Sequence, residues 1–177
     1  MSPLSPGAMA AFKAAWQVWQ VPAHHFLLRE KSVSDYLYFI EEGVARIFYH
    51  KHDKQITEWI ALDGNFFLSI TSYFERTPSK LNIQTLEPSL VYGIHNHDFM
   101  RMAAENHEVE TLLRRMVTRS LIMSQERMDS IQFESAQQRY EKLLENSPGI
   151  LQRVPLTYIA SFLGVTLETL SRIRSGK

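Results

Sequence analysis

The periodicity of apolar residues changes once along this chain, near residue 95, and that change limits the folds open to it. Between Ala23 and Ile94, apolar and aromatic residues occur in short β-branched runs separated by turn-like pieces, and beyond them they recur at helical spacing. Short strands with turns about every ten residues are typical of a sandwich or jelly-roll barrel. We therefore expect an α+β chain in which an antiparallel β jelly-roll precedes a helical region.

The strand signal lies in six runs: His25–Leu28, Tyr36–Ile40, Val44–Tyr49, Ile56–Ala61, Leu81–Leu86 and Leu90–Ile94. Ala8–Gln20 has helical spacing, with its aromatic residues on one face, and is predicted to be a helix before the strands. The segment Phe66–Lys80 interrupts the strand rhythm and is predicted to hold a short helix around Leu68–Phe74.

After a short helix near Asp98–Asn106, a longer one is predicted over Val109–Phe133. At 1.5 Å per residue it would be about 37 Å long, too long for a small barrel to cover. A helix from a second copy would cover it, so we expect a homodimer; the alternative is a helix lying on its own sheet. The expected dimer interface is Val109, Leu112, Leu113, Met116, Val117, Ser120 and Met123.

The stretch Val154–Arg174 has the pattern of a helix-turn-helix. Two short helices, Leu156–Leu163 and Leu167–Arg174, flank Gly164-Val165-Thr166. Glycine takes the left-handed conformation that ends a helix, and threonine caps the start of the next one. A preceding helix over Ser135–Leu144 completes the unit. The expected organisation is a sensor barrel over residues 1–108, a dimerisation helix over 109–134 and a DNA-binding domain over 135–177.

The second helix of this pair would enter the DNA major groove. Arg172 is expected to hold guanine through two hydrogen bonds and Glu168 to accept from cytosine N4. The residues expected to contact the DNA backbone are Thr157, Tyr158, Thr166, Thr169 and Ser171. The competing interpretation is a plain helical hairpin whose polar face is merely solvated.

Charge and composition narrow the classes of function. Residues 1–108 carry 9 basic and 12 acidic side chains, whereas residues 136–177 carry 6 and 3, so the positive end is the one with the candidate reading helix. The chain has no cysteine, which excludes disulfides, thiolate zinc sites and cysteine nucleophiles. It shows neither a signal peptide nor an apolar run long enough to span a bilayer, so we expect a cytoplasmic protein with no membrane partner.

Several motifs in this order resemble the Crp/Fnr superfamily of bacterial transcription regulators, and the resemblance covers nearly the full length. The matching pieces are Asp35–Gly43 with the following strand, Asp63–Phe67, Gln137–Tyr140 and Val154–Arg174. The resemblance implies a cyclic-nucleotide-binding-like barrel (a double-stranded β-helix), a homodimer along the long helix, and base reading by Glu168 and Arg172. Double-stranded DNA is then the expected partner, with RNA polymerase and a small-molecule effector as candidates, and no enzymatic activity is expected.

The segment that holds the phosphate in nucleotide-binding members of this family departs from their pattern. Leu68-Ser69 and Ser79-Lys80 stand where those members have a glycine-glutamate pair and an arginine-serine or arginine-threonine pair. A lysine supplies a point charge instead of a guanidinium fork. A cyclic nucleotide is therefore not expected; the alternatives are another small ligand or an apolar-filled barrel. The candidate pocket is Gly64, Phe66, Phe67, Leu68, Ser69, Ser79 and Lys80.

Two further departures concern DNA contact. Leu167 stands where an arginine commonly precedes the glutamate of the reading helix, which would replace a polar contact by a methyl contact to thymine. The sequence ends at Lys177, where many members continue into a two-stranded wing. This is either a short branch of the family or a truncation, and without a wing we expect lower affinity and a weaker salt dependence.

Two other classes of protein compete with the regulator. One is a ligand-sensing or protein-interaction module with a vestigial DNA-binding end. The other is a cupin-like metalloenzyme, suggested by the pairs His95-Asn96-His97 and His50-Lys51-His52. Cupins need a carboxylate a few residues after such a pair, and Glu105 is too far from His97. No metal, cofactor or catalytic residue is therefore assigned.

Overall fold

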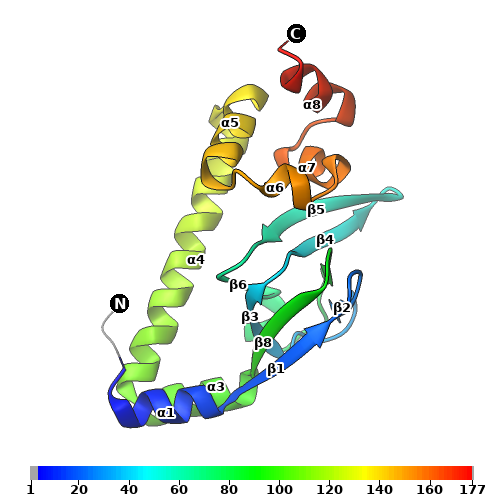
Figure 1. The fold of residues 1–177 in the computed structure, drawn as a ribbon. Helices are drawn as coiled ribbons and strands as arrows, with labels where there is room; N and C mark the ends of the chain where they lie inside the picture. Colours follow the sequence, from blue (N-terminus) through cyan, green and yellow to red (C-terminus); the bar gives the residue numbers. More distant parts are fainter. Residues whose placement is uncertain (1–3, 177) are drawn as a thin grey trace.

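In the computed structural model, which describes residues 4–176, two four-stranded antiparallel sheets face each other (Figure 1). One sheet has the order β1 (Trp16–Val21), β8 (Ser89–His95), β3 (Tyr36–Glu42) and β6 (Asn65–Phe67). The other has the order β2 (Phe26–Leu28), β7 (Asn82–Thr85), β4 (Ala45–Lys51) and β5 (Lys54–Ala61). The expected antiparallel β jelly-roll is thus confirmed.

The space between the sheets is filled by side chains. Tyr38 and Phe67 stack at a centroid distance of 5.4 Å inside it, and the Tyr38 hydroxyl donates to the Leu27 carbonyl over 2.9 Å. Burial raises the pKa of Tyr38 above its usual value, because the phenolate would lose its hydration. Aliphatic residues from both sheets complete this core, among them Leu28, Ile40, Ile47, Ile83 and Val91.

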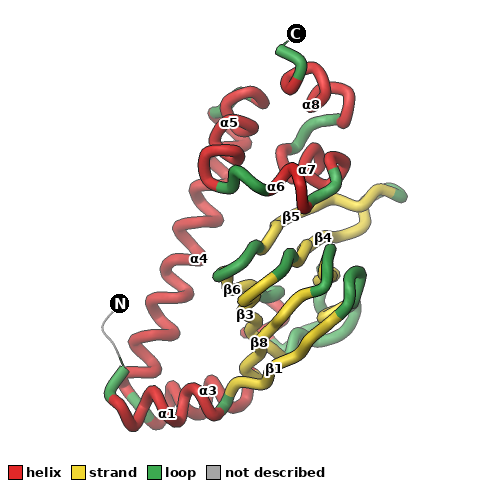
Figure 2. Tube along the Cα trace, in the orientation of Figure 1, coloured by secondary structure: helices red, strands yellow, loops and turns green. Residues whose placement is uncertain are grey.

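Helices lie at both ends of the barrel, α1 and α3 at one end and α6 and α7 beside β5 at the other (Figure 2). Their bounds are α1 Pro6–Ala14, α2 Ile70–Glu75, α3 Asn96–Glu105, α4 His107–Phe133, α5 Ala136–Asn146, α6 Ile150–Arg153, α7 Leu156–Leu163 and α8 Leu167–Arg174. A second core holds α3 and α4 on the barrel through Leu37, Ile94, Phe99 and Val109. From this end α4 runs the length of the molecule as a rod toward α5 (Figure 1).

The predicted helix over Ala8–Gln20 is wrong in its second half. The helix ends at Ala14, and the chain continues as β1, which pairs with β8 from Trp16↔Ile94 to Val21↔Ser89. The aromatic spacing resembled a helix, but pairing with a distant strand decides the conformation of such a segment, and local periodicity does not report it. In β1, Trp19 packs against Tyr36 with a centroid distance of 5.2 Å.

One glycine has a conformation and surroundings that no other residue tolerates. Gly43 has φ +124°, and a Cβ built there would lie 2.9 Å from the backbone Cα of Ser89. We expect Gly43→Ala to lower the free energy of unfolding by about 2 kcal/mol or more, through backbone strain and overpacking. Gly149→Ala, where no atom lies within 4 Å of the added Cβ, should change it by less than about 0.5 kcal/mol.

Urea unfolding followed by circular dichroism measures both variants. Equal stability of the two would contradict the close approach of Gly43 to Ser89.

Candidate nucleic-acid interface

The C-terminal helix pair has the geometry of a helix-turn-helix. Helix α7 ends at Gly164, which is left-handed with φ +70°, and α8 begins at Thr166, whose hydroxyl accepts from the Thr169 backbone N–H over 3.2 Å. The helices α5, α6, α7 and α8 pack together and are called the helical unit below. Leu170 is fully buried and holds α8 in this unit. Both helices have the bounds that the sequence predicted.

One face of α8 is open to solvent and polar. Glu168, Ser171 and Arg172 are exposed, Thr169 is half-buried, and Leu167 is exposed beside them. The hydroxyl of Thr166, the backbone and the positive charge of Arg172 lower the pKa of Glu168, so its carboxylate is ionised at neutral pH. This helix points away from the barrel at the far end of the molecule (Figure 1). An ionised acceptor and a guanidinium thus lie one turn apart on a free surface.

Helix α7, in contrast, packs against β5 of the barrel. The Thr57 backbone N–H donates to the Ser161 hydroxyl over 2.8 Å, and the rings of Trp59 and Phe162 meet edge to face at 6.1 Å. Tyr158, expected at the DNA backbone, lies with its ring 3.7 Å from the Arg46 guanidinium. Tyr158 therefore belongs to the contact between α7 and the barrel in this arrangement, whereas Thr157 is exposed.

Arg46 is the residue of this contact that sequence inspection missed. Its side chain is 1% exposed, and it donates to Thr57 Oγ1 over 2.9 Å and to Gln55 Oε1 over 2.8 Å. Its remaining nitrogen, Nη2, has no hydrogen-bond partner among residues 4–176. Burial lowers the pKa of Arg46 to about 10, partly offset by Tyr158. The contact between α7 and β5 therefore buries a positive charge whose lost hydration is only partly replaced by hydrogen bonds.

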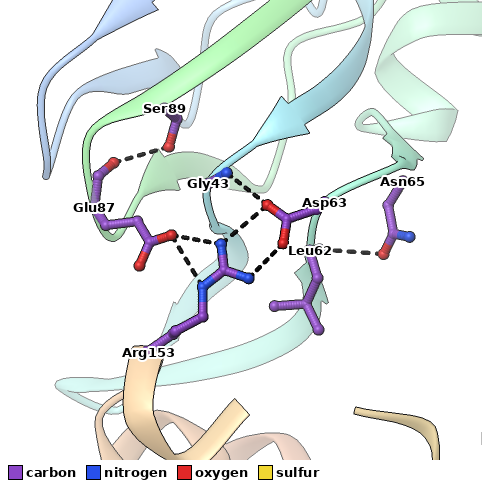
Figure 3. A network of polar contacts seen from close by, with 7 residues as sticks. All are labelled: Gly43, Leu62, Asp63, Asn65, Glu87, Ser89 and Arg153. Carbon is purple, nitrogen blue, oxygen red and sulfur yellow. Dashed lines mark hydrogen bonds and ion pairs between the residues drawn. The ribbon is translucent and has the colours of Figure 1, made fainter. Parts of the chain in front are cut away.

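A second contact, the Arg153 clamp, joins the end of α6 to two barrel loops (Figure 3). Arg153 Nη1 lies 2.5 Å from Asp63 Oδ2, and its Nε and Nη2 lie 3.1 and 2.5 Å from Glu87 Oε1. Asp63 also accepts from the Gly43 backbone N–H over 2.7 Å. These bonds lower the pKa of Asp63, led by the bond from Arg153, and raise the pKa of Arg153. The clamp thus fixes the helical unit to the barrel through charged groups.

Two arginines, one on the rod and one on α5, bind the end of α7. Arg127 of α4 donates to the Phe162 carbonyl over 2.8 Å, and Arg139 of α5 donates to the Leu163 carbonyl over 2.9 Å. The last carbonyls of a helix lack partners within it and carry partial negative charge, so guanidinium groups stabilise them. The contacts of α7 therefore join barrel, rod and helical unit.

The residues predicted to form a ligand pocket differ in burial and in the side chains they contact. Ser69 and Ser79 are buried, and their hydroxyls lie 2.9 Å apart. Phe67 points into the barrel core, but Phe66 points outward and packs on Phe39 at 4.9 Å. Leu68 packs under α3 and α4. Gly64 and Lys80 are exposed.

These residues do not fit a cyclic phosphate. Such an anion in a buried site needs a paired cation and hydrogen-bond donors. Here the two serine hydroxyls bond to each other, and the guanidinium of this segment, Arg76, binds the Ser34 carbonyl over 2.9 Å and pairs with Asp35. The residues that hold phosphate in nucleotide-binding members thus serve the internal structure of this segment.

The rod bears an exposed apolar stripe, which consists of Val117, Leu121, Met128 and Ile131. Their spacing of four, seven and three residues follows a heptad seam, and Leu121 is 68% exposed. Six of the seven predicted interface residues lie off this stripe: Val109 is 1% exposed within its own core, Leu113 and Met116 pack beside it, and Leu112, Ser120 and Met123 are half-buried. Val109 is therefore removed from the predicted interface.

The histidine pairs do not form a metal site in the part of the chain that is described. His95 ends β8 and accepts from the His97 backbone N–H over 3.2 Å, capping α3, so the two rings do not share a strand face as expected. His50 lies 3.4 Å from Glu30. No group of three or more histidine, aspartate or glutamate residues within residues 4–176 could hold a metal ion.

This architecture is a jelly-roll barrel joined by a rod to a helix-turn-helix. A family model, the cyclic nucleotide-binding domain, matches residues 18–106, and the chain belongs to that family. Over nearly its whole length the chain shares its fold with the solved structures of FixK2 and a catabolite activator protein, as the resemblance to the Crp/Fnr superfamily implied. No protein of curated function matches the chain by sequence. Within residues 4–176, no helix combines the length and apolar character that a membrane span requires.

Three solved structures illustrate the fold. FixK2 from Bradyrhizobium japonicum is 20% identical with a TM-score of 0.78, covering 91% of this chain and 83% of its own. CLP, the c-di-GMP responsive global regulator of Xanthomonas campestris, is 13% identical with a TM-score of 0.73, covering 96% and 90%. The catabolite activator protein of Thermus thermophilus is 20% identical with a TM-score of 0.61, covering 99% and 84%.

The Arg153 clamp makes stability depend on pH in a defined direction. We expect Arg153→Ala to lower the free energy of unfolding by about 1 kcal/mol at pH 7, the upper end for exposed ion pairs. The folded-state pKa of Asp63 is below the ordinary value of 3.8, so the clamp contributes fully above that pH. The difference between wild type and variant should shrink as the pH falls below 3.8.

Urea titrations at pH 7, 5 and 3 measure this difference. Arg101→Ala, which removes an exposed pair with Asp98 at 3.4 Å, serves as the control and should have little effect at any pH. A difference that stays constant down to pH 3 would argue against the pairing with Asp63.

Proposed function

We propose that the chain is a homodimeric, sequence-specific DNA-binding transcription regulator of the Crp/Fnr type. The observation that carries the proposal is the polar face of α8, with Glu168 and Arg172 exposed on a correctly capped helix-turn-helix. A recognition helix needs such a free face, since base edges are read by side chains that enter the major groove. The surrounding hydroxyls of Thr166 and Ser171 suit phosphate contacts.

The docking of α7 on the barrel leaves this face free. The barrel contacts use Tyr158, Ser161 and Phe162, all on α7, whereas α8 lies beyond them. In the helical unit, α8 is therefore free to enter a DNA groove while α7 is bound to the barrel. This division supports base reading by Glu168 and Arg172 over the alternative of a solvated hairpin.

Dimerisation is proposed along the apolar stripe of α4 in place of the interface expected from the sequence. Two copies of the stripe, packed in parallel, would cover Leu121 and Met128 in a short coiled-coil seam. The pairing would place two α8 helices on one side of the molecule. A dimer of this class reads half-sites about one helical turn of DNA apart, so a pseudo-palindromic target is expected.

Leu121→Glu tests the seam, because it places a carboxylate where the two rods would meet. We expect it to weaken dimerisation by at least about 2 kcal/mol, shifting the mass measured by multi-angle light scattering toward the monomer of 20.6 kDa. Ile122→Glu is the matched control: this neighbouring apolar residue is 44% exposed but points elsewhere on the helix. A dimer that survives the first variant, or dissociates equally in both, would refute the seam.

Arg172→Ala tests base reading. Selection from random duplex DNA should enrich a pseudo-palindrome with the wild type, and the variant should bind it about 1–3 kcal/mol more weakly with relaxed specificity at one position of each half-site. Arg101→Ala, an exposed arginine on α3, should bind as the wild type does. Absence of an enriched sequence, or enrichment that ignores Arg172, would favour a sensing module with a vestigial DNA-binding end.

A further inference from the structure

A cavity of about 350 Å³ lies where the barrel, the rod and the helical unit meet. We name it the junction cavity. Its walls come from β5, α4, α5 and α7, and its apolar side is formed by residues such as Trp59, Met123 and Phe162. The volume lies at the lower end of the range of small-molecule sites in proteins. None of the predicted ligand-pocket residues lines it.

The polar side of the junction cavity is positively charged. Arg119, Arg127, Arg139 and Lys142 line it against one carboxylate, Glu126. Lysine and arginine side chains that outnumber carboxylates around an apolar-walled cavity attract an anion. The cavity thus combines cationic groups with a surface that would receive an apolar or aromatic body.

These cationic side chains differ in the hydrogen bonds and ion pairs that they already form. Arg127 and Arg139 each donate to a carbonyl at the end of α7, and Lys142 pairs with Glu134 over 2.9 Å. Arg119 has a looser pairing, 3.9 Å from Glu126, and its side chain is 64% exposed at the cavity. Arg119 is therefore the cation best placed to turn toward a ligand.

The charge balance deeper in the junction agrees with this assignment. Burial and the neighbouring charge of Arg139 lower the pKa of Arg127, while Glu58 and Tyr49 act in the opposite direction. Burial raises the pKa of Glu58, and the positive charge of Arg127 opposes this shift. An anion in the junction cavity would add the negative charge that these groups supply incompletely.

The proposed dimer leaves the junction cavity open. The α4 residues that line it, including Arg119, Met123 and Glu126, lie about 150° around the helix from the apolar stripe, at 3.6 residues per turn. A partner rod on the stripe would therefore cover the opposite side of α4. The cavity is accessible in monomer and dimer alike.

We propose that the junction cavity binds a small organic anion, one with an aromatic or apolar body and a phosphate, sulfonate or carboxylate group. The anionic group would lie against Arg119 and Lys142, and the body against Trp59 and Phe162. Because its walls come from three parts of the molecule, an occupant stabilises the docked arrangement by its affinity for that arrangement over the open one. An effect on DNA binding would rest on the proposed function, but ligand binding itself does not.

The test uses the full chain and the fluorescent anion 1-anilinonaphthalene-8-sulfonate as probe. We expect saturable binding of one probe per chain, and Arg119→Ala should weaken it at least about tenfold, the loss of one hydrogen bond to a charged group. Met123→Trp should abolish it by filling the cavity. Arg114→Ala is the matched control, since it removes an arginine of the same helix that is 62% exposed and does not line the cavity.

Circular dichroism of each variant verifies that it is folded. Affinity that is unchanged in Arg119→Ala, or reduced equally in Arg114→Ala, would overturn the site, as would absence of saturable binding. A probe signal that survives both cavity variants but is lost in Leu121→Glu would place the probe on the apolar stripe and also overturn it. The measurement needs no DNA, so its failure is distinct from failure of the proposed function.

Discussion

The packing of α7 against β5 is the contact on which the arrangement of this molecule depends. Val44 and Ile60 of the barrel share one buried cluster with Ile159, Leu163 and Leu170 of the helix-turn-helix. The apolar cluster joins units that are distant in sequence, and the charged groups around it fix their relative orientation. Arg153 acts through the barrel loops, and Arg127 and Arg139 act through the end of α7. Helix α8 is positioned by its neighbour α7 and has few contacts of its own with the barrel.

Much of this fold could be predicted because its signals are local. Alternating apolar runs identified most strands, and Gly164 with Thr166 located both helices of the pair, since each residue type serves a specific backbone geometry. The error at Trp16–Gln20 arose because strand pairing is not local: the same aromatic spacing suits a helix face or an edge strand beside β8. The Arg153 clamp could not be predicted either, because Asp63 and Glu87 come from separate loops that only the folded barrel brings together.

Helix α4 shows a second reason why part of the structure could not be predicted from the sequence. The spacing of apolar residues predicted that α4 is a helix with an apolar face to bury, but these residues occur on two of its faces. Val109 and Met116 face the protomer's own core, whereas Leu121 and Met128 face solvent. Periodicity alone does not tell which face its own barrel covers. The candidate ligand segment has a similar ambiguity: Phe66 and Phe67 are adjacent in sequence, and a strand sends them to opposite faces, so the pattern alone does not tell which of them faces the barrel interior.

Arg46 affects the stability of the contact between barrel and helical unit, because its charged side chain is buried there. Its guanidinium is enclosed between the rings of Phe48 and Tyr158, and one of its nitrogens is left without a partner among the described residues. Separation of α7 from β5 would return this group to water, and the hydration it regains offsets part of the apolar area exposed at the same time. Separation of the two units should therefore cost less than the apolar area of their contact implies. Warming should favour opening less than it would at a purely apolar joint, because the hydration of charged groups weakens as temperature rises.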